Sequence, residues 1–91
     1  MDRESSLIVE FYGIPRQRAG RAELRVPAGT VSDVLAAIQS RCPALAGLVR
    51  ADGRLGPHYL LSVNGQSFIR DGSVRLGPGD RVLLLSADAG G

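Results

Sequence analysis

The sequence predicts an α+β fold: one main helix packed across one face of a mixed sheet of four to five strands. Segments with the alternating apolar pattern of strands stand on both sides of a single segment with helical spacing, and clear turn signals separate them. A chain of 91 residues has the length of a single domain. We therefore expect one domain at residues 1–85, followed by a flexible tail at residues 86–91.

The N-terminal part is expected to form a hairpin of two strands. Residues 7–14 are rich in β-branched and aromatic residues, and a second strand is expected at residues 22–26, with Leu24 and Val26 facing inward. Residues 15–20 are interpreted as a basic turn or loop between them. Alternation divides the first strand into two faces, with Leu7, Val9 and Phe11 on one and Ile8, Glu10 and Tyr12 on the other.

A helix is expected after the strand-breaking residues 27–29. Thr30 stands at the N-cap position, and Asp33 places a carboxylate in the first turn. Apolar residues follow at helical spacing, namely Val31, Val34, Leu35, Ile38 and Cys42. Pro43 is expected to end the helix.

Turn signals divide the second half of the chain into short strands. Residues 44–56 are expected to be an irregular connection, with a short turn of helix considered at residues 44–49 and a turn at Asp52-Gly53. Residues 59–63 are expected to be a strand, Asn64-Gly65 is typical of a type I′ hairpin, and a short strand at residues 66–69 returns.

The last turn and strand complete the order of elements. Residues 77–80, Gly-Pro-Gly-Asp, are expected to form a type II turn, and residues 81–85 form the final strand. The expected order is therefore strand, strand, helix, strand, strand, strand, which is that of the β-grasp fold.

Composition argues against several classes of function. The net charge is only +2, and the eleven basic residues, all arginines, are scattered along the chain among few aromatics, which does not favour nucleic-acid binding. Cys42 is the only cysteine and His58 the only histidine, so neither an internal disulfide nor a nitrogen–sulfur zinc site is expected. The first apolar run breaks at Glu10, so no signal peptide or membrane span is expected, and the default compartment is the cytoplasm.

Several short motifs stand in a fixed order along the chain. They are Val9-Glu10-Phe11, Ala19-Gly20, Pro27-Ala28-Gly29-Thr30-Val31, Val63-Asn64-Gly65, Leu76-Gly77-Pro78-Gly79-Asp80-Arg81-Val82 and a diglycine C-terminus, Gly90-Gly91. With these motifs the chain, from residue 7 to residue 91, resembles the ThiS/MoaD family of ubiquitin-like sulfur-carrier proteins. The first strand and its loop are most similar to those of the small subunit of molybdopterin synthase.

The resemblance implies a carrier protein and not an enzyme. Gly91 would be adenylylated and then converted to a thiocarboxylate by an E1-like adenylyltransferase/sulfurtransferase, and the sulfur would pass to a sulfur-accepting synthase subunit. It implies partners that are neither nucleic acid nor membrane. No cofactor is expected on this chain, because ATP and Mg²⁺ would be bound by the activating partner. Molybdenum cofactor biosynthesis is the first expectation, with thiamine or a specialised pathway as alternatives.

The tail fits this chemistry. Gly90 and Gly91 carry no Cβ and can therefore enter a narrow channel, and six extended residues, 86–91, reach roughly 20 Å. Ala87, Asp88, Ala89 and Gly90 are expected to lie in the partner's channel. The tail departs from the molybdopterin branch, whose approach is commonly proline-rich, and this leaves a specialised pathway open.

Other candidate residues have structural explanations as well as functional ones. Ile8, Leu60, Leu83 and Leu85 are expected to form an apolar docking surface, the alternative being a central strand covered on both faces. Arg16, Arg18 and Arg21 suit a solvated loop better than a docking rim. Cys42 is expected to be a buried packing residue, His58 a strand-edge residue and residues 77–79 a turn without bound phosphate.

Two other classes of function stay open at this point. The chain could be a protein modifier that is conjugated to target lysines through Gly91, or a ubiquitin-like binding module that is never activated. The chain itself contains no lysine, so none of its own side chains can accept an isopeptide bond.

Overall fold

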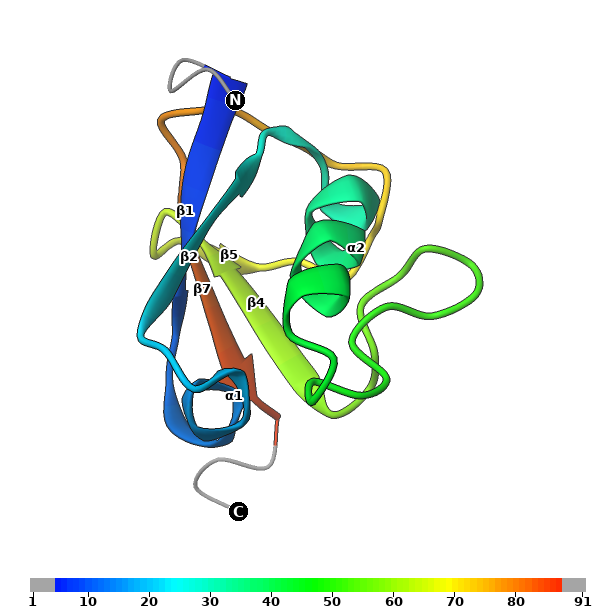
Figure 1. Cartoon of the computed structure of the whole chain (residues 1–91). Helices are drawn as coiled ribbons and strands as arrows, with labels where there is room; N and C mark the ends of the chain where they lie inside the picture. The colour runs from blue at the N-terminus through cyan, green and yellow to red at the C-terminus, as the bar shows by residue number, and fades with distance from the viewer. Residues whose placement is uncertain (1–4, 88–91) are drawn as a thin grey trace.

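The structure, a computed structural model, describes residues 5–87. Five strands form one mixed sheet in the order β2-β1-β7-β4-β5 (Figure 1). They are β1 (Ser6–Phe11), β2 (Glu23–Pro27), β4 (Tyr59–Val63), β5 (Ser67–Phe68) and β7 (Arg81–Ser86). A small second sheet pairs β3 (Gly29–Thr30) with β6 (Arg75–Leu76), and the helices are α1 (Gly13–Ala19) and α2 (Val31–Arg41).

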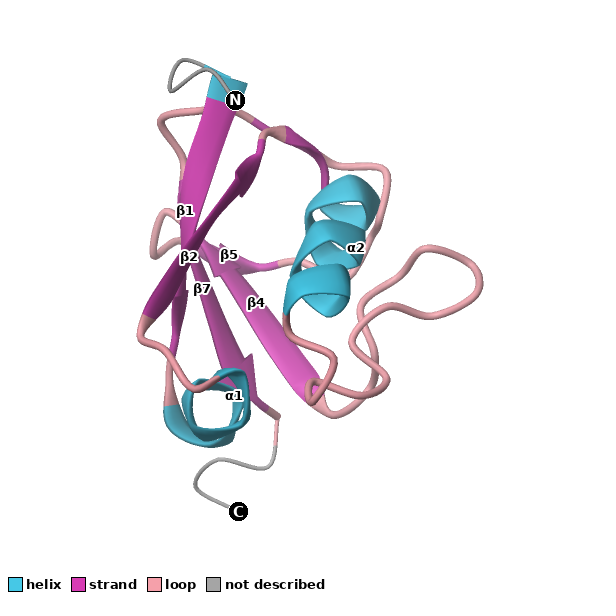
Figure 2. Ribbon diagram, viewed as in Figure 1, coloured by secondary structure: helices cyan, strands magenta, loops and turns pink. Residues whose placement is uncertain are grey.

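The topology is that of the predicted β-grasp fold. The central strands β1 and β7 run parallel, whereas β2 and β4 pair antiparallel on either side of them. The helix α2 lies across one face of this sheet, and α1 lies at the end of the sheet where β7 finishes (Figure 2). In the described part of the chain, no helix is long and apolar enough to cross a membrane.

The local sequence explains why α2 forms where it does. The Thr30 hydroxyl oxygen accepts the Asp33 N–H at 3.1 Å, and the Asp33 carboxylate accepts the Thr30 N–H at 3.1 Å, so the predicted N-cap is a complete capping box. At the other end the Cys42 N–H donates to the Ile38 carbonyl, and Pro43 cannot continue the ladder.

The core lies between α2 and the inward face of the sheet. One of the two predicted faces of β1 is buried, together with the residues of β2 predicted to face inward and the helical residues at the predicted spacing. These residues are Leu7, Val9, Phe11, Leu24, Val26, Val31, Val34, Leu35, Ile38 and Cys42.

A single truncation in α2 tests this core. Leu35 is fully buried, so Leu35→Ala removes buried methyl groups and leaves a cavity; we expect a loss of about 2–5 kcal/mol in the free energy of unfolding. Urea denaturation measures it. Ala36→Ser, on the exposed side of the same turn, should change stability by less than about 0.5 kcal/mol. Equal midpoints for the two variants would contradict the packing described here.

The region between β1 and β2 differs from the prediction. The strand expected to reach residue 14 ends at Phe11, and the segment interpreted as a loop contains the helix α1. Pro15 lies in the first turn of α1, where a missing N–H costs little, and Gly20 closes the helix in the left-handed conformation with its N–H bound to the Arg16 carbonyl. The helix was missed because seven residues are too few to show a clear period.

The connection after α2 has no helical turn at residues 44–49. The side chain of Gln39 instead makes hydrogen bonds with backbone groups of this segment. The Gln39 amide donates to the Leu45 carbonyl at 2.6 Å, and its oxygen accepts the Leu48 N–H at 3.0 Å. These two bonds hold Leu45 and Leu48 in the core without a helix.

The chain turns at Asp52-Gly53 as predicted, and the two turns whose type was predicted had different outcomes. Asn64 and Gly65 both have positive φ, 57° and 66°, and the Gln66 N–H donates to the Val63 carbonyl, as a type I′ turn requires. The type II turn expected at residues 77–80 is wrong, because Gly79 does not have the positive φ that this type needs. Proline at the second position suits a type I turn equally well, and the Asp80 carboxylate closes the turn by accepting the Gly77 N–H at 2.8 Å.

Candidate functional site

The face of the sheet opposite α2 carries the leucines proposed for docking. Leu60 on β4 lies directly opposite Leu85 on β7, and Leu83 is the next outward-facing residue of β7. All three are half-buried, so they are neither sealed as in a fully covered central strand nor wholly exposed. We call Leu60, Leu83 and Leu85 the outer leucine patch.

An aromatic residue that the sequence interpretation overlooked extends this patch. Phe68 on β5 pairs with Ser62, which itself pairs with Leu83, so all three side chains share the outer face. Phe68 is 64% exposed. A phenylalanine with this exposure beside half-buried leucines is typical of a protein-binding surface. No signal in the sequence marks this position: a two-residue Asn64-Gly65 hairpin would pair Phe68 with Leu61, whereas the observed register leaves three residues, 64–66, between the strands.

Ile8 does not join the outer leucine patch directly. Its neighbours along the ladders are Arg25 on β2 and Arg81 on β7. A polar cluster stands between Ile8 and the end of the patch: the Tyr12 hydroxyl donates to the Glu10 carboxylate at 2.7 Å, and the Arg81 guanidinium lies 3.3 Å from the other oxygen of Glu10. The outer face of the sheet therefore has an apolar part, the outer leucine patch with Phe68, and a charged part around Glu10, Arg25 and Arg81.

The contacts within this polar cluster shift the pKa values of Glu10 and Tyr12. The hydrogen bond from Tyr12, assisted by the charge of Arg81, lowers the pKa of Glu10 below its ordinary value. The same hydrogen bond raises the pKa of the Tyr12 hydroxyl. Glu10 is thus ionised at neutral pH and holds Tyr12 on the outer face.

The pKa of Glu10 predicts how stability depends on pH. Because the folded-state pKa is lowered, the contribution of Glu10 is present above its unfolded value and is lost as pH falls through the folded value. Glu10→Gln should therefore destabilise the protein at about pH 7 and make no difference at about pH 2. Urea denaturation at both values measures it, with Tyr12→Phe expected to show part of the same loss. A destabilisation by Glu10→Gln that is equal at both pH values would contradict the assignment.

The chain leaves the sheet beside α1. Ser86, the last residue of β7, is buried, and the N–H of Ala87 donates to the His58 carbonyl at 2.9 Å. A cavity of about 250 Å³ adjoins this point. Its lining comes from α1, from the loop after α2 and from the sheet: Ile14, Pro15, Arg18, Ala46, His58, Tyr59 and Ser86.

The surroundings of this exit are basic and partly apolar. Arg16 and Arg18 are exposed on α1, so they belong to a helix and not to the expected loop. Ile14 is 46% exposed on the same helix, and His58 is exposed just before β4. Of the tail predicted at residues 86–91, Ser86 is instead the buried end of β7 and Ala87 is described, whereas Asp88, Ala89, Gly90 and Gly91 lie outside the described residues.

The remaining candidates have structural roles. Cys42 is buried and has no disulfide, as expected of a packing residue. The Gly77 N–H is already occupied by the Asp80 carboxylate, whose pKa is lowered mainly by that bond, so residues 77–79 form a turn closed by the chain itself. Among residues 5–87, no three His, Cys, Asp or Glu side chains gather as metal ligands would.

Comparisons with known proteins agree with this fold. No family model and no curated protein matches the sequence. The crystal structure of SAMP1, a small archaeal modifier protein of Haloferax volcanii, matches with a TM-score of 0.76 and 28% identity, over 94% of this chain and 99% of that one. A putative molybdopterin converting factor subunit 1 from Pyrococcus furiosus matches with a TM-score of 0.71 and 22% identity, over 89% and 95%.

A third similar structure is the Amycolatopsis orientalis BexX/CysO complex, matched with a TM-score of 0.75 and 21% identity, over 93% of this chain and 99% of that one. At this identity the last two matches show the fold. The predicted resemblance to ubiquitin-like proteins of the ThiS/MoaD type is confirmed.

Proposed function

We propose, on the premise of the ThiS/MoaD resemblance, that this chain is a sulfur-carrier protein whose Gly91 is activated by a partner enzyme. The carboxylate of Gly91 would form an acyl-adenylate with release of pyrophosphate from ATP. A sulfur nucleophile would then displace AMP and leave a thiocarboxylate. The chain itself is proposed to be a substrate or small subunit and not a catalyst.

The observation that carries the proposal is the position of Gly90-Gly91 relative to β7. Five residues, 87–91, follow Ser86, the end of the strand, and an extended chain of that length reaches at most about 18 Å. A folded domain held at the mouth of a channel can therefore deliver the Gly91 carboxylate into a partner's active site. Glycine at the last two positions lets the backbone pass where a Cβ would collide.

The partner is proposed to be an E1-like adenylyltransferase/sulfurtransferase that supplies ATP, Mg²⁺ and the catalytic groups. The outer leucine patch with Phe68 supports docking next to the tail, because Leu85 lies one residue before the last residue of the strand that leads into it. A sulfur-accepting synthase subunit would be the second partner. We propose the cytoplasm as the compartment, because activation consumes ATP.

The pathway that receives the sulfur is proposed from two of the neighbours. The Pyrococcus furiosus structure is described as a molybdopterin converting factor subunit and the Amycolatopsis orientalis structure as a complex with BexX. Molybdenum cofactor biosynthesis is therefore the first candidate and a specialised pathway with its own acceptor the second. Ser86 to Ala89 contain neither proline nor an aromatic residue, which favours the second.

Mass spectrometry tests the proposed function. The purified chain is incubated with a candidate E1-like enzyme from the same genome, MgATP and a sulfur donor. The intact mass should rise by the difference between one sulfur and one oxygen, and the gain should require ATP. An unchanged mass with an enzyme that thiolates another carrier in the same preparation would count against the proposal.

A second candidate function, protein modification, is favoured by the likeness to SAMP1, which is a modifier by its name. In that case Gly91 would form an amide with lysine side chains of target proteins. Because the chain has no lysine, its conjugates should carry single copies unless its α-amino group is used. Lysine-linked Gly91 in peptides from a cell extract would distinguish this role from sulfur transfer.

A further inference from the structure

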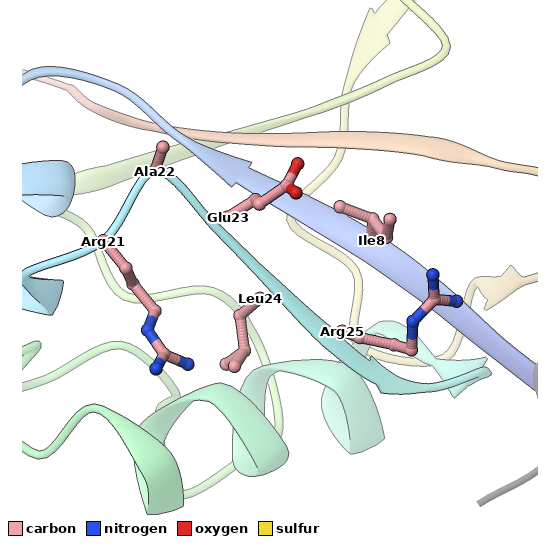
Figure 3. A pocket seen from close by; sticks show the side chains of 6 residues that line it. All are labelled: Ile8, Arg21, Ala22, Glu23, Leu24 and Arg25. Atoms are coloured by element: carbon pink, nitrogen blue, oxygen red, sulfur yellow. The ribbon is translucent and has the colours of Figure 1, made fainter.

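The strand β2 forms one edge of the five-stranded sheet and leaves room for another strand. In the described part of the chain, β1 is its only neighbour in the sheet. A cavity of about 550 Å³ runs along the strand, lined by Ile8 and by residues 21–25 (Figure 3). The opposite edge of the sheet, β5, is only two residues long.

The hydrogen-bond pattern determines which backbone groups of β2 face this cavity. The Ala22 carbonyl accepts from the Phe11 N–H, and the Ala28 N–H donates to the Ser5 carbonyl, both at 2.8 Å. The backbone N–H and carbonyl groups of the even-numbered residues of β2 therefore bond to β1. In an antiparallel strand the backbone groups of the alternate residues point to the opposite side, which here is the free edge. Glu23 and Arg25 consequently turn their N–H groups, and Glu23 its carbonyl, toward the free edge.

The C-terminal end of β2 is protected against pairing with another strand, and its N-terminal end is not. The Arg25 carbonyl accepts a hydrogen bond from the Arg41 guanidinium at 3.3 Å, and Pro27 has no N–H to offer. Both features are known to prevent non-specific association of an edge strand with strands of other molecules. Residues 21–24 have neither, so Glu23 and the N–H of Arg25 offer unprotected backbone groups to an added strand of a few residues.

Three guanidinium groups surround this stretch. Arg41 reaches it from the last turn of α2, and Arg25 is held on the outer face by its hydrogen bond to the Ser6 hydroxyl at 3.0 Å. Arg21, which lies two residues before β2 begins, extends on the side of α2, together with Leu24 (Figure 3). Glu23 is the one carboxylate among residues 21–25.

These charges indicate the chemistry of the occupant. Side chains of an added strand alternate between the two faces of the sheet, so acidic residues on either face would meet an arginine. Arginine pairs with carboxylates through parallel hydrogen bonds, which gives such contacts specificity. A second copy of this chain would instead bring a similar set of arginines against the first, and the like charges would repel.

We propose that the free edge of β2 binds an extended acidic segment of a partner protein as an additional strand. Main-chain hydrogen bonds would form at Glu23 and Arg25, and acidic side chains would pair with Arg21 and Arg41. This contact lies on the sheet edge away from β5 and goes beyond the proposed activation of Gly91.

The test uses the full chain labelled with ¹⁵N and two blocked probe peptides. One alternates valine and glutamate, and the other alternates valine and lysine with the same β-propensity. The glutamate peptide should shift the amide signals of Glu23 and Arg25, slow their solvent exchange and bind more weakly as salt is added. The lysine peptide should leave these signals unchanged.

Matched variants distinguish binding at the β2 edge from general electrostatic attraction between the acidic peptide and the basic protein. Arg21→Gln/Arg41→Gln should weaken binding of the glutamate peptide by about tenfold, whereas Arg50→Gln/Arg54→Gln, which removes the same charge from an exposed loop, should leave it unchanged. Equal affinity of both variants, equal binding of the two peptides, or shifts confined to Phe68 would overturn the proposal. So would shifts of Glu23 and Arg25 that grow with protein concentration alone, because a second copy would then occupy the edge. No activating enzyme is present, so the result is independent of the proposed sulfur chemistry.

Discussion

Deleting Gly91 is expected to abolish thiocarboxylate formation and to leave the folded domain intact. The deletion moves the carboxylate back by about 3.5 Å, and misplacement of about 1 Å can already cost a hundredfold in rate when reacting groups must be aligned. The rate of thiolation by an E1-like enzyme, followed by intact mass, should therefore fall by at least about a hundredfold.

The control for this experiment keeps the whole tail and removes a charge elsewhere. Arg54→Gln, in an exposed loop, retains the position of the Gly91 carboxylate and should be thiolated within about a few-fold of the wild-type rate. Thermal unfolding should be the same for all three proteins. If the shortened chain is thiolated as fast as the intact one, Gly91 is not the site and the sulfur-carrier proposal fails, whatever the outcome at the β2 edge.

The elements with strong local signals could be predicted from the sequence. The capping box of Thr30 and Asp33 and the apolar spacing from Val31 determine α2, and the strand at residues 59–63 has the bounds predicted for it. The prediction and the structure agree for these two elements because local propensity and burial favour the same structure there. The inward faces of β1 and β2 follow from alternation for the same reason.

Elements that depend on distant parts of the chain could not be predicted. Each strand of the β3–β6 pair is two residues long and exists because Gly29 meets Leu76 across the fold. The helix α1 lies against the end of the sheet, and a segment with only one buried residue, Pro15, has no period to detect. Tertiary contacts, and not local preference, decide such segments.

In the candidate site, too, features set by local sequence could be predicted and features set by strand pairing could not. Alternation along β7 identified Leu83 and Leu85 as outward-facing, and the register confirms that Leu60 joins them. Alternation alone cannot show which strands are neighbours. Ile8 was therefore grouped with the leucines although Arg25 and Arg81 are its partners, and Phe68 was overlooked although it shares their face.

Placing a charge in the outer leucine patch is expected to impair activation with little effect on folding. Leu85 is half-buried in the free chain and would be fully buried under a docked enzyme. Because about half of this side chain is already buried in the free chain, Leu85→Glu removes about 0.8–1.5 kcal/mol of apolar burial on docking, and it also buries a carboxylate at the interface. The apolar contribution alone corresponds to roughly a 4- to 13-fold lower kcat/KM for the carrier as substrate, with the change mainly in KM.

The comparison variant for Leu85→Glu is Val74→Glu. Val74 is also half-buried, but it packs near the N-terminus of α2, where the Val31 N–H donates to its carbonyl. Both variants introduce the same charge, so a general effect of acidity or of stability would lower kcat/KM in both. We expect thiolation of Val74→Glu to stay near the wild-type rate at temperatures below its unfolding transition. Equal losses in the two variants, or none in Leu85→Glu, would show that the partner docks on another face, and the exposed residues of α1 beside the tail would be the next surface to test.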